Sequence, residues 1–185
     1  MIHLYATRKL LAHLPLDEQH QLAPTPRTQW LFERAPLENN PLSGWHGHVL
    51  TLQRRNTLLL IHNATRFPLV VPGLKKSDWA QLNDYFADAL LNTLLKCGAH
   101  DKQMDIAQQY LRPLQANAPY DRSVLGTLNH AKADLEHLLW YDSVQIADLN
   151  RYRLGAWLAD RPCSSKGHKV LWPQQAMLEL LDSLS

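Results

Sequence analysis

Alternating apolar and polar positions predict strands in the first part of the chain. The alternation occurs in IHLYAT (2–7), and the segments HVLTLQ (48–53) and TLLLIHN (57–63) are expected to form two further strands joined through a short turn. A further apolar run, RFPLVVPG (66–73), contains Pro68, which cannot donate a hydrogen bond to a neighbouring strand. We therefore predict that this last strand lies at a sheet edge or carries a bulge.

Helical spacing dominates the rest of the chain. Apolar residues recur three and four positions apart in the segments 78–97, 101–112, 122–141 and 147–159. Two shorter helices are expected at 8–14 and 172–184. Because the strands are grouped before the helices, the pattern indicates an α+β fold. We expect a small, mainly antiparallel sheet, formed by an N-terminal strand plus a three-stranded meander, packed against several helices.

The region between the first helix and the meander lacks either pattern. Residues 15–44 are rich in proline and polar side chains, although Trp30, Leu31 and Phe32 are expected to attach the middle of the segment to the core. Residues 161–169 are expected to form a second loop. We therefore predict a single domain over residues 1–185 with a long loop at about 15–44.

Composition narrows the function classes. A hydrophobic fraction of 45% supports a substantial core, and a net charge of +2 gives no domain-wide attraction to nucleic acid. Cys97 and Cys163 form no CxxC pair, which argues against a cysteine zinc site or a thioredoxin-type motif. The N-terminus lacks a signal-peptide pattern and no apolar stretch reaches bilayer length. The expected location is the cytoplasm.

Three histidines of the predicted hairpin are candidate metal ligands. His46 and His48 share a strand face, and the position of His62 depends on the turn. A two-residue turn at Arg55-Asn56 places His62 on the opposite face, whereas a three-residue turn that also includes Arg54 places all three histidines together. No Asp or Glu between residues 39 and 77 supplies a fourth ligand. We therefore predict no metal.

Several motifs recur in a recognisable order. They are Trp45-His46, Arg54-Arg55, VPG at 71–73, and RSVLG at 122–126 with Asn129. Their order and spacing resemble an uncharacterised bacterial family, a domain of unknown function found in chromosomal and plasmid-borne hypothetical proteins. His48 departs from the small polar residue that the family resemblance implies there. The resemblance brings no activity with it.

These motif residues also have structural interpretations. Trp45 is expected to close one end of the core, and Asp121 or Ser123 to cap the helix that follows. Gly126 lies inside that helix, where glycine costs about 1 kcal/mol relative to alanine, so we expect another backbone to pass close to it.

Two further groups of residues are candidates for chemistry. Segment 151–169 contains cations that suggest a nucleic-acid surface beside Trp157 and Trp172; these are Arg151, Arg153, Arg161, Lys166 and Lys169. We favour the alternative that these cations are solvated helix and loop positions and that both tryptophans lie in the core. Cys163 with His168, or Ser123 with a histidine, would be a nucleophile pair, but no nucleophile-elbow or phosphate-loop motif surrounds them.

The absence of a catalytic or cofactor motif favours a binding protein. We expect a non-catalytic cytoplasmic protein, without a cofactor or membrane contact, that acts through a protein partner, a second copy of itself or, as a weaker possibility, nucleic acid. The candidate binding residues are Trp45, His46, Arg54, Arg55, Arg122 and Asn129. The alternative is an enzyme with an unrecognised polar site near His46, Arg54, Arg122 and Asn129. A deep polar pocket joining those residues would favour the enzyme, and a flat apolar patch would favour binding.

Overall fold

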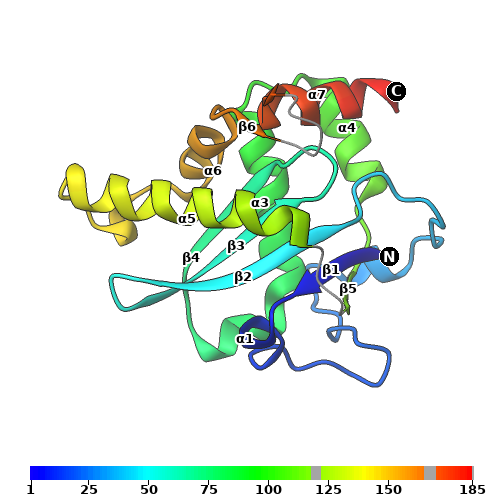
Figure 1. Ribbon diagram of the computed structural model, residues 1–185. Helices are drawn as coiled ribbons and strands as arrows, with labels where there is room; N and C mark the ends of the chain where they lie inside the picture. The colour runs from blue at the N-terminus through cyan, green and yellow to red at the C-terminus, as the bar shows by residue number, and fades with distance from the viewer. Residues whose placement is uncertain (118–121, 165–169, 185) are drawn as a thin grey trace.

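A five-stranded mixed sheet forms the centre of the computed structural model, which describes residues 1–117, 122–164 and 170–184 (Figure 1). The strand order is β4-β3-β2-β1-β5. The strands are β1 (Ile2–Ala6), β2 (Trp45–Leu52), β3 (Arg55–His62), β4 (Pro68–Leu74) and β5 (Leu114–Asn117). Strands β2, β3 and β4 form the antiparallel meander, whereas β1 runs parallel to both β2 and β5. The predicted α+β fold is confirmed.

Strand β5 is missing from the sequence prediction. It directly follows Pro113 and pairs in register with β1, Ile2 opposite Leu114. A parallel pair has no tight turn between its strands, so the partner of β5 is a segment at the other end of the sequence. Four residues alone carry too weak an alternating pattern to predict such a strand.

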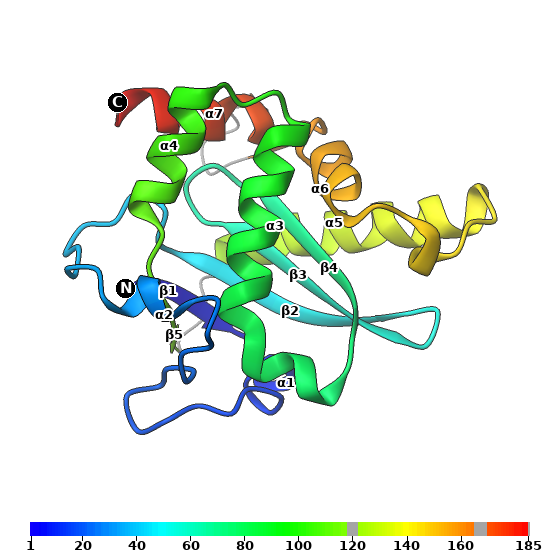
Figure 2. The ribbon, with the colours of Figure 1, turned by 180° about the vertical axis from the view of Figure 1, so that it is seen from behind.

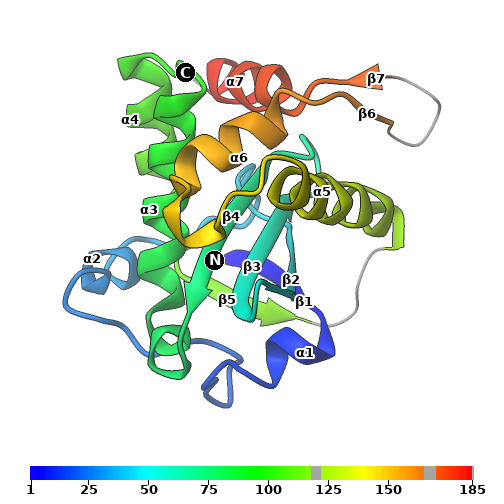
Figure 3. The same ribbon diagram turned by 90° about the vertical axis from the view of Figure 1, so that its left-hand side faces the viewer.

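Helices cover both faces of the sheet (Figures 2 and 3). They are α1 (Arg8–Leu11), α2 (Gln29–Phe32), α3 (Leu82–Lys96), α4 (Asp101–Tyr110), α5 (Arg122–Tyr141), α6 (Arg151–Ala159) and α7 (Pro173–Ser183). Two 3-10 turns, η1 (Lys76–Gln81) and η2 (Ile146–Asp148), precede α3 and α6, and a small ribbon pairs β6 (Cys163–Ser164) with β7 (Val170–Leu171). None of these helices, within the described residues, has the length and apolarity to cross a membrane.

Several predicted helices have different ends in the structure. The predicted 78–97 helix begins as η1, because the Asp78 carboxylate accepts a hydrogen bond of 2.7 Å from the Lys75 amide and caps that tighter turn. The predicted 147–159 helix is divided into η2 and α6, since the Asn150 side chain caps a new helix at Tyr152 and Arg153. Helix α5 has the predicted bounds.

Alternate residues of β2 and β3 supply two separate cores. One face carries Trp45, Val49, Leu58 and Leu60, which join the cluster that includes residues of α3 and α7. The other face carries Leu50, Leu59 and Ile61, which pack against apolar residues of α5 and α6. This two-sided burial explains why the middle of β3 is apolar without interruption.

Helix α6 lies against the edge strand β4 and against α3 (Figure 3). Pro68 is therefore at a sheet edge, as predicted, but that edge is covered rather than exposed to a partner. The close approach depends on Gly155 of α6, where an added Cβ would lie 3.0 Å from the Thr93 side chain and 3.5 Å from the Pro68 carbonyl oxygen.

The long N-terminal loop is attached to the core at its middle. Leu31 of α2 is fully buried and Phe32 packs against the main core, whereas Trp30 remains exposed. Isolated bridges join Leu16 to Leu22 and Gln21 to Gln115. The predicted anchoring therefore holds for two of the three apolar residues.

Candidate functional site

The β2–β3 hairpin turns at Gln53 and Arg54, not at the Arg55-Asn56 or Arg54-Arg55-Asn56 positions predicted. Leu52 pairs with Arg55, and the two residues between them have φ of 46° and 64°. Positive φ at both positions is the geometry whose twist matches that of a two-residue hairpin. Neither position is Gly, Asn or Asp, so no local turn signal marked it.

This register separates the three histidines. Trp45 lies opposite His62, so His62 faces the α3 side of the sheet, whereas His46 and His48 face the α5 side. The imidazoles cannot converge on one ion. Among the described residues no group of three His, Cys, Asp or Glu side chains could hold a metal.

His62 has a structural role. Its Nε2 lies 3.1 Å from the Ser43 carbonyl oxygen, to which it must donate, and its Nδ1 lies 2.9 Å from the Thr65 hydroxyl, from which it accepts. Burial lowers the pKa of His62 from 6.5 to about 4, so the ring is neutral near pH 7. The Trp45 ring packs 5.0 Å away.

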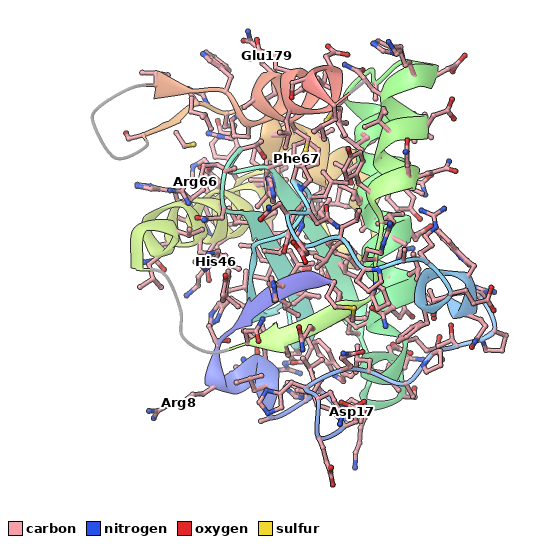
Figure 4. All side chains as sticks on the ribbon, turned by 90° about the vertical axis from the view of Figure 1, so that its right-hand side faces the viewer. Arg8, Asp17, His46, Arg66, Phe67 and Glu179 are labelled. Carbon is pink, nitrogen blue, oxygen red and sulfur yellow. The ribbon has the colours of Figure 1, made fainter. Side chains whose placement is uncertain are left out.

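His46 lies on the part of the sheet near the start of α5 (Figure 4), and His48 lies on the same face of β2 two residues along. His46 is fully buried, and its ring centroid lies 5.0 Å from that of Tyr5. His48 is half-buried, with Nδ1 at 3.3 Å from the Thr7 hydroxyl. Burial, followed by the charges of Lys9 and Lys132, lowers the pKa of His48. These contacts place both rings in the architecture of the sheet.

The predicted binding residues are spread over the molecule. Trp45 is fully buried, and its indole N–H donates to the Leu42 carbonyl at 2.7 Å. Asn129 is exposed on α5, and the side chain of Arg122, the first residue of α5, lies outside the described part of the structure.

Arg54 and Arg55 are exposed at the hairpin tip. His46 is near the other end of β2, roughly 20 Å from Leu52 at about 3.3 Å per residue. His46 and Arg54 therefore do not line one pocket.

The described basic residues of segment 151–169, Arg151, Arg153 and Arg161, do not present one charged surface. The Arg151 guanidinium pairs with Asp88 of α3, and that of Arg161 pairs with Asp134 of α5 at 3.2 Å. Arg153 is exposed two positions from Arg151, nearly opposite around the helix. Lys166 and Lys169 are outside the described residues. Arg151 thus ties the start of α6 to α3, and Arg161, just after α6, pairs with α5.

The candidate nucleophiles lack activation in the described structure. Burial raises the pKa of Cys163, and the opposing charge of Arg66 is a smaller effect. Burial also raises the pKa of Cys97, to about 12. A reactive thiol needs the opposite shift. His168, Asp121 and the Ser123 side chain lie outside the described residues.

An open groove of about 500 Å³ lies between the hairpin tip and the end of α5. We name it the hairpin-tip groove; it is lined by Thr51, Leu52, Gln53, Glu136, Leu139, Trp140, Ser143, Val144 and Gln145. The Gln53 side chain fixes its two walls, because Nε2 donates to the Val144 carbonyl at 2.9 Å and Oε1 accepts from the Ile146 amide at 2.7 Å. The groove is therefore held open by specific contacts.

Two aromatic residues at the end of α5 are almost fully exposed. Trp140 retains 79% of its accessible surface and Tyr141 retains 70%. This end of α5 and the hairpin tip extend on the same side of the molecule, to the left in Figure 1. Trp140 lines the groove, and the Tyr141 ring stacks on His137 with centroids 5.5 Å apart.

The sequence analysis did not single out this aromatic pair. The sequence does indicate that both side chains are exposed, because the apolar residues of α5 that are buried, Leu128, Leu135 and Leu139, recur at helical spacing along one face. Trp140 and Tyr141 fall outside that face and are therefore expected at the surface.

Charges of both signs surround the hairpin-tip groove. Neither Arg54 nor Arg55 pairs with a carboxylate among the residues that the structure describes. Glu136 lines the groove and lies 3.7 Å from Lys132 one helical turn away. The hairpin tip thus offers two cations beside an aromatic surface.

Comparisons with known proteins place the chain in a family without giving it an activity. No curated protein matches it. Among solved structures it is similar to a chain in the cryo-EM structure of the simian T-cell lymphotropic virus intasome in complex with PP2A regulatory subunit B56 gamma. That likeness has 12% identity and a TM-score of 0.40, over 88% of this chain and 60% of the other. A family model, "Domain of unknown function (DUF6933)", matches residues 3–176, so this chain belongs to the DUF6933 family.

Proposed function

We propose that this DUF6933 protein is a non-catalytic protein-binding module whose binding surface is the hairpin-tip groove with its aromatic edge. One observation carries the proposal: adjacent Trp140 and Tyr141 expose 79% and 70% of their surface at the rim of a fixed groove. Tryptophan and tyrosine are over-represented among the residues that dominate protein interfaces. An exposed aromatic patch rimmed by polar residues is typical of an interaction site.

The groove is suited to an apolar anchor. Leu52 and Leu139, both buried, and the exposed Trp140 supply its large apolar side chains. Gln53 already holds the loop at Val144 in place. Binding of a partner therefore loses little conformational entropy from ordering this loop. A single leucine, methionine or aromatic side chain of the partner fits the apolar lining.

The free cations at the hairpin tip favour acidic residues beside that anchor. Arg54 and Arg55 are exposed and unpaired within the described structure, so a partner carboxylate would gain a charge-assisted hydrogen bond. A phosphate backbone fits less well, because it carries many charges in a row, whereas the hairpin tip offers two cations and the net charge of the chain is only +2. We therefore infer a protein partner rather than nucleic acid.

A cytoplasmic bacterial setting is part of this proposal. Cys97 and Cys163 are both free thiols, as is usual for proteins of a reducing compartment. A partner from the same compartment is accordingly expected.

Site-specific photocrosslinking in the source organism tests the binding surface. A benzophenone amino acid in place of Tyr141 should give one main covalent protein adduct, and the same probe in place of exposed Trp172 on the α7 side should not. Reversing the charges with Arg54→Glu and Arg55→Glu should reduce the Tyr141 adduct about tenfold or more. The proposal is wrong if the adduct is nucleic acid, if both probes capture the same proteins, or if no adduct forms.

A further inference from the structure

A second concavity of about 500 Å³ lies on the α3 side of the sheet, between the N-terminal loop, α3 and the start of α6. We name it the α3 pocket, defined by Arg27, Trp30, Asp84, Tyr85, Asp88 and Arg151. Figure 3 shows α2, α3 and α6 on that side of the molecule. Its volume is within the range of small-molecule sites, about 300–1,000 Å³.

The side chains of the α3 pocket are held by specific contacts. Both carboxylate oxygens of Asp84 lie within hydrogen-bond distance of the Thr25 hydroxyl, at 3.0 and 2.9 Å. The Trp30 indole N–H donates to the Arg27 carbonyl at 2.9 Å, and the Arg34 guanidinium lies 4.3 Å from the centre of the same ring. Trp30 nevertheless remains 37% exposed and lines the pocket.

The α3 pocket contains one ion pair, Arg151 with Asp88, and two charged side chains outside any ion pair of the described residues, Arg27 and Asp84. Arg151 is neutralised by Asp88, which also accepts from the Tyr152 hydroxyl at 2.7 Å. The Arg27 guanidinium and the Asp84 carboxylate form no ion pair with each other or with other described residues. The pocket therefore presents one positive and one negative group at different places on its wall.

A ligand with a single charge would meet one of these groups unfavourably. An anion that pairs with Arg27 also faces Asp84, and a cation that pairs with Asp84 also faces Arg27. A molecule carrying both charges satisfies both, and the faces of Trp30 and Tyr85 that Arg34 and Arg151 leave uncovered offer contact to an aromatic body.

We propose that the α3 pocket binds a small zwitterion of the amino-acid class with an aromatic side chain. Its carboxylate pairs with Arg27, its ammonium group pairs with Asp84, and its ring packs against Trp30 and Tyr85. This site is separate from the hairpin-tip groove, and the proposal does not depend on the proposed function.

Isothermal titration of the full chain with L-phenylalanine, L-tyrosine and L-tryptophan tests the proposal. At least one should bind saturably. Its N-acetyl form, which lacks the positive charge, and its amide form, which lacks the negative charge, should each bind roughly tenfold more weakly or worse. The absence of saturable binding by all three amino acids, or equal binding of the blocked forms, would overturn the proposal.

Two variants test whether Arg27 binds the ligand carboxylate and Asp84 binds its ammonium group. Asp84→Asn keeps an oxygen that can accept from Thr25 and should weaken the amino acid about tenfold, whereas its N-acetyl form should bind no more weakly than before. Arg27→Gln should weaken the amino acid similarly, and the amide form should bind no more weakly than before. Trp172→Ala is the control and should alter none of these affinities. Equal losses for charged and blocked forms would show that the assignment of the charges is wrong.

Discussion

The side-chain amide of Gln53 donates a hydrogen bond of 2.9 Å to the carbonyl of Val144, which fastens the hairpin tip to the loop after α5. The same amide accepts from the buried Ile146 at 2.7 Å. One side chain therefore sets the distance between the two walls of the hairpin-tip groove. The proposed function depends on this prepared geometry.

Replacing Gln53 by asparagine should release the loop. Asparagine tolerates the positive φ of this position but is one methylene too short to reach Val144 and Ile146. We expect a loss of about 1–2 kcal/mol in the free energy of unfolding by urea. Hydrogen exchange of the Ile146 amide should accelerate, and unchanged exchange at that amide would show that Gln53 is not the fastening residue.

Substitution of Arg54 should separate its effect on stability from its effect on partner binding. Its φ of 64° is unfavourable for arginine, so Arg54→Gly is expected to stabilise the chain by about 0.5–1 kcal/mol. Arg55→Gly, one position along in β3, should destabilise it. If Arg54 contacts the partner, the stabilised Arg54→Gly variant should nevertheless crosslink less; a stable variant with full crosslinking would exclude Arg54 from the interface.

Two glycines inside helices should respond oppositely to alanine. An added Cβ at Gly126 meets nothing within 4 Å, so the expected close backbone is not there. Gly126→Ala should stabilise the protein by about 1 kcal/mol. Gly155→Ala should cost about 1 kcal/mol net, because its Cβ would lie 3.0 Å from the Thr93 side chain. Chemical denaturation of both variants checks the difference, and equal effects would contradict this account of α6 packing.

His62 should make the protein sensitive to acid. The unfolded chain protonates this residue near pH 6.5, and burial lowers the folded pKa to about 4. The stability contributed by the neutral ring is fully present above pH 6.5 and is lost as the pH falls toward 4, by roughly 3 kcal/mol in total. His62→Gln can still donate to Ser43 and accept from Thr65, so its unfolding free energy should fall less between these pH values. Parallel pH curves for the two proteins would contradict the prediction.

Local pattern was sufficient for some elements and not for others. The bounds of α5 were predicted because its apolar stripe repeats over many turns within one segment. Strand β5 was not predicted, since its parallel partner β1 lies at the far end of the sequence. The turn at Gln53-Arg54 was misplaced because neither residue belongs to the types that usually adopt positive φ.

The candidate site was predicted only in part. Arg54 and Arg55 were proposed as binding residues, and they lie at the tip that borders the groove. Trp45 and His46 were proposed with them, but a sequence does not show that these side chains are fully buried. The exposure of Trp140 and Tyr141 could have been inferred, because they lie outside the row of apolar residues that α5 buries. Their location beside the hairpin tip required the packing of α5 on the sheet.

Hydroxyl-radical footprinting measures the central claim most directly. The chain would be oxidised alone and in the complex isolated from its source organism, and the modification of each tryptophan compared by mass spectrometry. We predict that oxidation of Trp140, 79% exposed in the free chain, falls severalfold in the complex while that of Trp172 does not change. Equal oxidation of Trp140 in both samples would contradict a partner bound at the hairpin-tip groove.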